Sequence, residues 1–141
     1  MSEVFRGTEL FALIPQRPPI VMVDLLQDVT EEGALTGLLI QEDNLFLQDG
    51  KFSEPGLIEH IAQSAAAFAG FKGYAAGEKP KLGYIGELKR FFFYARPGAG
   101  KSLRTTLRVL GEAGGITLLA AETKVDGELV AEGQMKIFLD R

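Results

Sequence analysis

The sequence contains no cysteine and only one histidine, His60. The absence of cysteine excludes disulfide bonds, iron–sulfur clusters, thiolate-bound zinc and a cysteine nucleophile. A single histidine also excludes a metal site built from several histidines of one chain. These absences leave open a metal site built from carboxylates; no metal and no cofactor are predicted.

Long apolar runs and clusters of basic residues are also missing. No stretch of about 20 consecutive apolar residues occurs, so no membrane-spanning helix is predicted. Residues 1–6 lack the basic region and apolar run that mark a signal peptide. The net charge of −4 and the lack of a Lys/Arg run argue against nucleic-acid binding. We expect a cytoplasmic protein that binds neither nucleic acid nor a membrane.

The residues that are present have the composition of one globular domain. The chain has 141 residues, of which 46% are hydrophobic and 24% charged, which is enough to bury a core of its own. No internal repeat, low-complexity tract or linker divides it. Residues 1–141 are therefore predicted to form a single domain.

Residues 55–71 form the only long segment predicted to be helical, because they are rich in alanine. Ser53 suits the N-cap, and Pro55 suits the first turn. At about 100° per residue, one side of this helix is a wide apolar arc. The arc consists of Leu57, Ile58, Ile61, Ala62, Ala65, Phe68 and Ala69. Since Glu59 is the only charged residue of the segment, we expect the helix to be buried on nearly every side.

The rest of the chain is predicted to form strands, after a short helical turn over residues 8–14 capped by Thr8. The expected strands are residues 20–30, 34–41, 81–95, 101–112, 116–125 and 128–139. Asp126-Gly127 is a strong signal for a two-residue hairpin, and consecutive hairpins imply an antiparallel meander. The order predicts an α+β fold in which one antiparallel sheet curls around one helix. Because one sheet cannot cover the helix fully, we expect a second subunit to complete the cover.

Residues 95–102, Ala-Arg-Pro-Gly-Ala-Gly-Lys-Ser, match a loose form of the phosphate-binding loop. That chemistry requires a helix to begin at Lys101-Ser102, so that its amide groups face the phosphates. The residues that follow alternate like a strand, and no parallel βαβ unit surrounds them. We interpret this segment as a β-turn.

Glu59 is the residue of the helix whose chemistry points to a reaction. Its uncharged neighbours favour a partly buried carboxyl group, and burial favours the protonated form that a general acid needs. Gly56, at the start of the helix, would leave amide groups free to hold a substrate carbonyl oxygen. His60 points about 100° away from Glu59, so we expect a structural or interface histidine.

Several motifs resemble those of the bacterial β-hydroxyacyl-acyl-carrier-protein dehydratases. Residues 14–24 resemble the Leu-Pro-His-Arg-x-Pro…Val-Asp opening, and residues 55–63 are similar to the central-helix motif Pro-Gly…Glu-x-x-Ala-Gln. Weaker likenesses follow at residues 84–98 and 125–128. The likeness runs in the same order from about Ile14 to Leu139. It implies a hot-dog fold, in which an antiparallel sheet wraps around one long central helix.

The resemblance also implies a function. These enzymes remove water from 3-hydroxyacyl thioesters in fatty-acid or polyene biosynthesis, so an acyl thioester of a carrier protein or of coenzyme A is the expected ligand. Glu59 matches the catalytic acid of the family. Gly56, Leu57 and Gln63 lie beside it in the motif and are expected to bind substrate. No cofactor is implied.

One departure from the family concerns its catalytic histidine, which lies in a Gly-His-Phe-Pro-Gly stretch before the helix. Residues 44–52 occupy that region here and contain no histidine. In this respect the chain resembles the divergent dehydratase-like proteins of aryl-polyene pathways, some of which work beside a histidine-bearing dehydratase.

Three functions remain open at this point. The first is an active dehydratase in which Asp49 or Asn44 replaces the histidine. The second is a non-catalytic or accessory subunit that completes the site of a partner, and the third is an acyl thioesterase. The assembly is expected to be a homodimer or a heterodimer with a histidine-bearing dehydratase.

Overall fold

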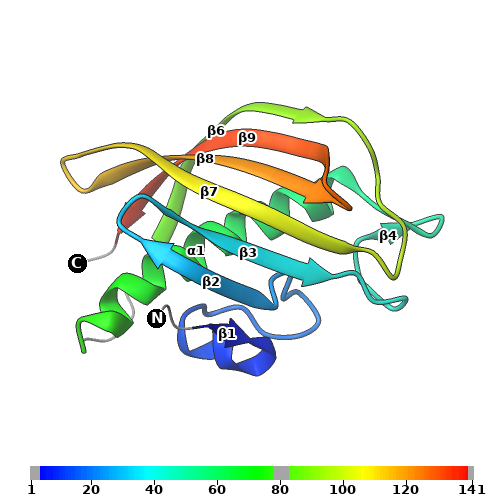
Figure 1. The fold of residues 1–141 in the computed structure, drawn as a ribbon, viewed down its shortest axis with the longest axis horizontal. Coiled ribbons are helices and arrows are strands. Elements are labelled where there is room, and N and C mark those ends of the chain that lie inside the picture. Colours follow the sequence, from blue (N-terminus) through cyan, green and yellow to red (C-terminus); the bar gives the residue numbers. More distant parts are fainter. Residues whose placement is uncertain (1–3, 78–82, 140–141) are drawn as a thin grey trace.

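The computed structural model describes residues 4–77 and 83–139, and it shows an antiparallel sheet curved around one long helix (Figure 1). The sheet has seven strands in the order β1-β2-β3-β7-β8-β9-β6, and a small hairpin, β4-β5, stands apart from it. This arrangement confirms the predicted α+β hot-dog fold. No helix within the described ranges is long and apolar enough to cross a membrane. The elements are β1 (Phe5–Arg6), the 3₁₀ helix η1 (Gly7–Ala12), β2 (Leu25–Thr30), β3 (Gly33–Leu39), β4 (Leu47–Gln48), β5 (Lys51–Phe52), α1 (Glu54–Ala75), β6 (Gly83–Phe93), β7 (Ser102–Ala113), β8 (Ile116–Val125) and β9 (Glu128–Leu139).

The helix α1 begins where its capping residues predict. The Ser53 hydroxyl accepts a hydrogen bond from the Gly56 amide at 3.3 Å, and the helix then runs over 22 residues to Ala75. Lys72 lies in the last turn of α1, where its positive charge interacts favourably with the negative end of the helix dipole. This interaction helps to extend α1 beyond the predicted end at Phe71.

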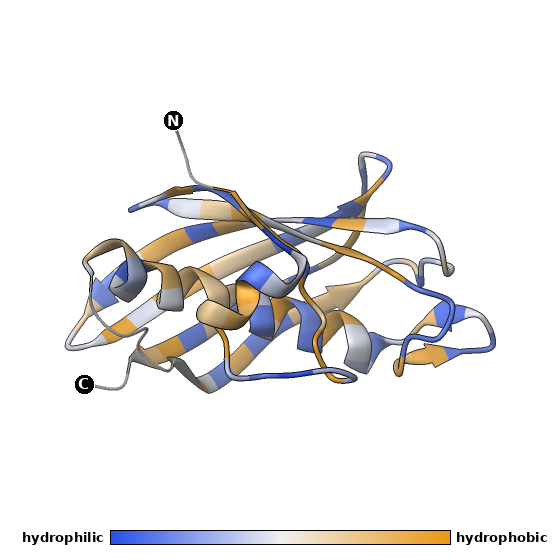
Figure 2. Ribbon diagram, turned by 90° about the horizontal axis from the view of Figure 1, so that it is seen from below, coloured by the Kyte–Doolittle hydropathy of each residue, from blue (hydrophilic) through white to orange (hydrophobic). Residues whose placement is uncertain are grey.

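The concave face of the sheet covers one side of α1, as Figure 2 shows from below. Leu57, Ile61 and Ala65 are fully buried against it, in two neighbouring apolar clusters. The side of the helix turned away from the sheet is only partly buried. The partly exposed residues of that side, which we call the open stripe, are Ile58, Glu59, Ala62 and Ala66.

The strands after the helix lie close to their predicted positions. The hairpin between β8 and β9 turns at Asp126 and Gly127, whose φ angles of 51° and 82° are those of the predicted two-residue turn. β7 begins at Ser102, so a strand and not a helix starts at the end of the segment 95–102, as the β-turn interpretation requires. The predicted start of the first of these strands, residues 81–82, lies outside the described residues.

The prediction of a four-stranded meander is wrong in one respect. β7, β8 and β9 are consecutive neighbours, but β6 pairs with β9, and β7 pairs with β3. The chain between β6 and β7 crosses the sheet, because its backbone forms hydrogen bonds with Phe52 and Ile40. The Pro97 carbonyl accepts from the Phe52 amide at 2.7 Å, and the Gly100 amide donates to the Ile40 carbonyl at 2.7 Å.

The first predicted strand also differs from the structure. Residues 20–24 are not part of the sheet, and β2 begins only at Leu25. The backbone there is held by the helix, since Gln63 binds both the Ile20 carbonyl and the Met22 amide. The predicted turn over residues 8–14 is a 3₁₀ helix, Gly7–Ala12. Its N-cap is Arg6, whose amide donates to the Glu9 carboxylate at 2.8 Å, and not Thr8.

Candidate functional site

The candidate site is centred on Glu59 in the second turn of α1. One oxygen of its carboxylate, Oε2, accepts a hydrogen bond from Gln63 Nε2 at 2.7 Å. The two residues are four positions apart, so they lie on the same face of the helix. Glu59 is the only acidic residue of the open stripe, where Ile58, Ala62 and Ala66 are its uncharged neighbours.

Gln63 is buried and fixed by the protein on every side. Its Oε1 accepts from the Met22 amide at 2.6 Å, and its Nε2 donates to the Ile20 carbonyl at 2.8 Å as well as to Glu59. Because the Met22 N–H can only donate, it must face the amide oxygen, which settles the orientation of the Gln63 side chain. The Glu59 carboxylate is thus held by a side chain that has no freedom to turn.

His60 lies in the core and is fully buried. Its Nδ1 is 2.7 Å from the Met22 carbonyl oxygen, and its Nε2 is 2.7 Å from Thr105 Oγ1. Since a carbonyl oxygen only accepts, Nδ1 carries the proton, and the Thr105 hydroxyl donates to Nε2. The Thr123 hydroxyl, 2.7 Å from Thr105 Oγ1, then completes the chain as a donor.

Burial disfavours the charged imidazolium and lowers the pKa of His60 to about 4. The ring is therefore neutral at neutral pH, and both of its nitrogens are engaged inside the protein. This placement agrees with the structural histidine expected from the sequence. It leaves Glu59 without a histidine of its own chain.

Asn44 and Asp49, the predicted substitutes for a catalytic histidine, lie in the segment that leads to the helix. The side chain of Asn44 is occupied: its Oδ1 accepts from the Phe46 amide at 2.8 Å, and its Nδ2 lies 3.4 Å from Met22 Sδ. Asp49 is exposed in the turn between β4 and β5, with a positive φ of 53°. Neither residue makes a hydrogen bond with Glu59, whose partner within the described residues is Gln63.

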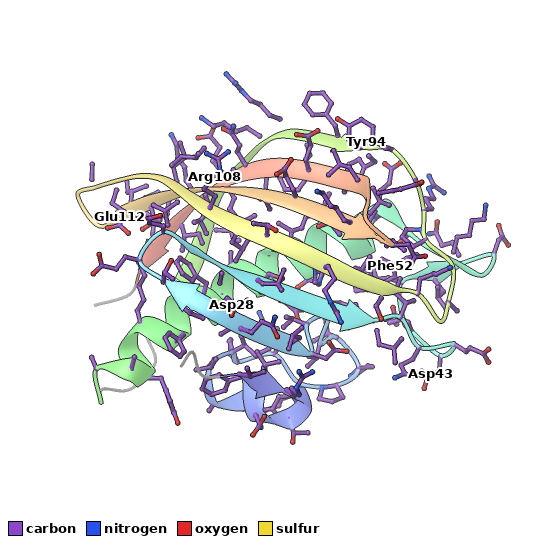
Figure 3. All side chains as sticks on the ribbon, viewed as in Figure 1. Asp28, Asp43, Phe52, Tyr94, Arg108 and Glu112 are labelled. Carbon is purple, nitrogen blue, oxygen red and sulfur yellow. The ribbon has the colours of Figure 1, made fainter. Side chains whose placement is uncertain are left out.

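The three residues expected to bind substrate all have roles in building the site. The Gly56 amide is not free, contrary to the expectation from the sequence, because it donates to the helix cap Ser53. The side chain of Leu57 is fully buried in the same apolar cluster as Phe52. Gly56 also lets the chain pack closely, because a Cβ at this position would come within 2.7 Å of Phe46 and 2.9 Å of Phe52. Figure 3 labels Phe52 where the small hairpin meets the main body of the molecule.

Sequence reasoning missed the polar contacts that hold the site. The pairing of Glu59 with Gln63 follows from their spacing of four residues, so the sequence contained its signal. Met22 and Thr105 gave no such signal, because their partners are distant in the chain. Within residues 4–77 and 83–139, no group of three or more acidic or histidine side chains is placed to hold a metal ion.

Residues 8–140 match the family model of the ApeP-like proteins, described as ApeP dehydratase. The 3-hydroxyacyl-[acyl-carrier-protein] dehydratase FabZ of Vibrio cholerae is 30% identical over 135 residues, which cover 92% of this chain and 88% of that protein. FabZ of Lactococcus lactis subsp. cremoris is 29% identical over 149 residues, which cover all of both chains.

Among solved structures, the chain is similar to a component of the dehydratase heterocomplex ApeI:P from Xenorhabdus doucetiae. The TM-score is 0.84 at 17% identity, and the match covers 94% of this chain and 91% of that one. A hypothetical thioesterase with coenzyme A from Streptococcus pneumoniae gives a TM-score of 0.67 at 9% identity, over 81% of this chain and 86% of that one. At these identities the two likenesses establish the fold.

Proposed function

Because the chain belongs to the family of ApeP-like dehydratases, we propose that it is a subunit of a 3-hydroxyacyl-[acyl-carrier-protein] dehydratase in which Glu59 transfers protons to and from an acyl thioester. The observation that carries this proposal is the fixed carboxylate on the open stripe of α1. Gln63 holds it at 2.7 Å, and no charged side chain of the stripe competes with it.

Dehydration of a 3-hydroxyacyl thioester needs two proton transfers. A base removes the proton from the carbon next to the thioester carbonyl, and an acid protonates the hydroxyl group that leaves as water. One carboxylate can perform both transfers only in sequence, which is slow. A fast reaction therefore requires a second titratable group opposite Glu59.

The chain offers no histidine for this second role, since its single histidine is committed to the core. We propose that a histidine-bearing dehydratase supplies the group as a second subunit. The fold match to a component of a dehydratase heterocomplex supports this choice. The alternative is a homodimer in which Asp49 or Asn44 acts with Glu59. Asp49 is the first of the two to test, because its carboxylate is exposed.

Two surfaces support the presence of a second subunit. β6 lies at the edge of the sheet and is paired only with β9 in the part of the chain that the structure describes. Ile85, Leu88 and Phe92 on this strand are exposed by 38%, 43% and 54%, and a long apolar edge strand favours pairing with another chain. The open stripe of the helix is the second surface.

The test of the proposal is the substitution Glu59→Gln in the complete complex, assayed for dehydration of a 3-hydroxyacyl-carrier-protein substrate. Glutamine keeps the size and the hydrogen bond to Gln63 but cannot transfer a proton, so the rate should fall by about 10²–10⁴-fold. Glu54→Gln is the matched control, since Glu54 lies in the same helix and pairs with Arg96 at the surface.

Glu54→Gln should keep the parent rate, and both variants should unfold at the parent temperature. A Glu59→Gln complex that dehydrates the substrate at the parent rate would contradict the proposal. Hydrolysis of acyl-CoA that depends on Glu59, without dehydration, would instead assign the chain to the thioesterases.

A further inference from the structure

One row across the outer face of the sheet contains three basic residues, Arg6, Arg104 and Lys124. The strand register places Arg6 opposite Leu25, Leu25 opposite Gly37, Gly37 opposite Arg104, and Arg104 opposite Lys124. Residues directly opposite each other on antiparallel strands point to the same face, and like charges in such a pair destabilise the sheet. The pairing of Arg104 with Lys124 therefore has a cost that a bound anion would relieve.

Arg6 and Arg104 line one cavity of about 300 Å³, together with Ser102 and Asp24. The Asp24 carboxylate is partly occupied, since its Oδ2 accepts from the Leu39 amide at 2.8 Å. The ion pairs found between described residues involve neither arginine. Two guanidinium groups against one carboxylate leave the cavity positively charged.

Gly37 makes the position of the Arg104 side chain possible. A Cβ at residue 37 would lie 2.6 Å from Arg104 Nη1, so any larger residue would push the guanidinium group away. Arg104 Nη1 also donates to the Leu103 carbonyl at 3.2 Å. The guanidinium group thus rests against the sheet over the one position of the row that has no side chain.

The sheet separates this cavity from Glu59. The residues on either side of Arg104, Leu103 and Thr105, are fully buried on the inner face, where Thr105 binds His60 of the helix. A phosphate group bound in the outer cavity would therefore lie on the opposite face of the sheet from Glu59.

We propose that this outer cavity binds the phosphate group of a phosphate ester with an apolar chain. The planar guanidinium group forms paired hydrogen bonds with phosphate oxygens, and the Ser102 hydroxyl is a further donor. A second hollow of about 410 Å³ shares Gly7, Asp24 and Leu39 with the cavity. Phe11 and Leu45 line that hollow, where the apolar chain of the ester would bind.

Calorimetric titration of the full chain at low salt with inorganic phosphate and with hexyl phosphate tests this inference. Both should bind saturably at one site, and Arg104→Gln and Gly37→Ala should each weaken binding by about tenfold or more. Arg108→Gln is the matched control, because Arg108 is exposed four residues further along β7, away from the cavity (Figure 3). It should bind as the parent does.

A tighter affinity for hexyl phosphate than for inorganic phosphate would identify an ester as the ligand, and equal affinities would identify free phosphate in the same site. If Gly37→Ala does not fold, Arg104→Lys replaces it, since lysine keeps the charge but loses the paired donors. No saturable binding by the parent, or an equal loss in Arg108→Gln, would overturn the inference. These readouts do not depend on dehydration, so they stand apart from the test of Glu59.

Discussion

At the scale of single residues, Gln63 connects the candidate catalytic carboxylate to the backbone of the segment Ile20–Met22. Its three hydrogen bonds, at 2.6, 2.7 and 2.8 Å, satisfy one buried amide and one carbonyl of that segment while they hold Glu59. We therefore propose that Gln63 positions Glu59, which is the group proposed to reach the substrate.

We expect Gln63→Met to reduce the rate of dehydration by about tenfold or more in the complex and to shift its pH–rate profile, because Glu59 loses the donor that fixes it. Ser64→Ala is the control, since Ser64 is a buried neighbour that binds Thr36 at 2.7 Å. It should lower the free energy of unfolding without moving the pH–rate profile. Identical profiles for the parent and Gln63→Met would show that Gln63 has only a structural role.

His60 makes the free energy of unfolding depend on pH. The folded chain keeps its imidazole neutral down to a pKa of about 4, whereas the unfolded chain takes up a proton near 6.5. Stability from this group is complete above pH 6.5 and is lost as the pH falls toward 4, by roughly 3 kcal/mol in all.

Denaturant unfolding at several pH values between 7.5 and about 4.5 measures this loss. A His60→Gln variant should be less stable at pH 7.5, because the glutamine replaces the hydrogen bonds of the ring poorly. Below pH 6, each unit by which the pH is lowered should reduce the free energy of unfolding of the parent by about 1.4 kcal/mol more than that of His60→Gln. Parallel pH dependences of the two proteins would mean that His60 does not titrate in this way.

At the scale of the elements, local signals predicted α1, β8 and β9 well, because capping residues and the Asp126-Gly127 turn act within a few residues. Residues 20–24 were predicted as strand because their apolar pattern fits one. In the structure their backbone groups bind Gln63 and His60, which are about 40 residues away. A local pattern contains no information about hydrogen bonds to residues so distant in the chain.

The place of β6 was unpredictable for the same reason. Turn residues at Pro97-Gly98 suggest a hairpin, but the hydrogen bonds to Phe52 and Ile40 that carry the chain across the sheet are long-range contacts. In the site, the sequence singled out Glu59 and a structural His60. The network that holds both residues became visible only when Met22 and Thr105 were placed beside them.

The exposed edge β6 should mediate pairing with the second subunit. A charge placed on this edge opposes pairing, so we expect Phe92→Lys to weaken the dimer by about tenfold or more. Leu110→Lys is the control, because Leu110 is exposed by 39% on β7, which β8 and β9 separate from β6. With a histidine-bearing dehydratase present, sedimentation should show the parent and the control in a complex heavier than the single-chain mass of 15.3 kDa.

Phe92→Lys should shift toward the single-chain mass at micromolar concentration. The same comparison with the chain alone distinguishes a heterodimer from a homodimer. A parent chain that remains a monomer in both experiments would contradict the assignment of β6 as an interface.

At the scale of the whole molecule, the sheet covers one side of the helix and leaves the side of Glu59 open. The chain thus offers a fixed carboxylate to the proposed shared active site, while its histidine is enclosed in the core. The sequence predicted the fold and this carboxylate. It could not predict what faces Glu59 across an interface, because that information belongs to a second chain.

The most direct test is the rate of dehydration of a 3-hydroxyacyl-carrier-protein substrate, measured for the purified chain alone and for its equimolar mixture with a histidine-bearing dehydratase. The partner is measured alone as well. We expect the chain alone to be nearly inactive and the mixture to exceed the sum of the separate rates by about 10²-fold or more, since the second proton-transfer group is then present. High turnover by the isolated chain, or a mixture no faster than the sum of its parts, would contradict the proposal that the active site is shared between two subunits.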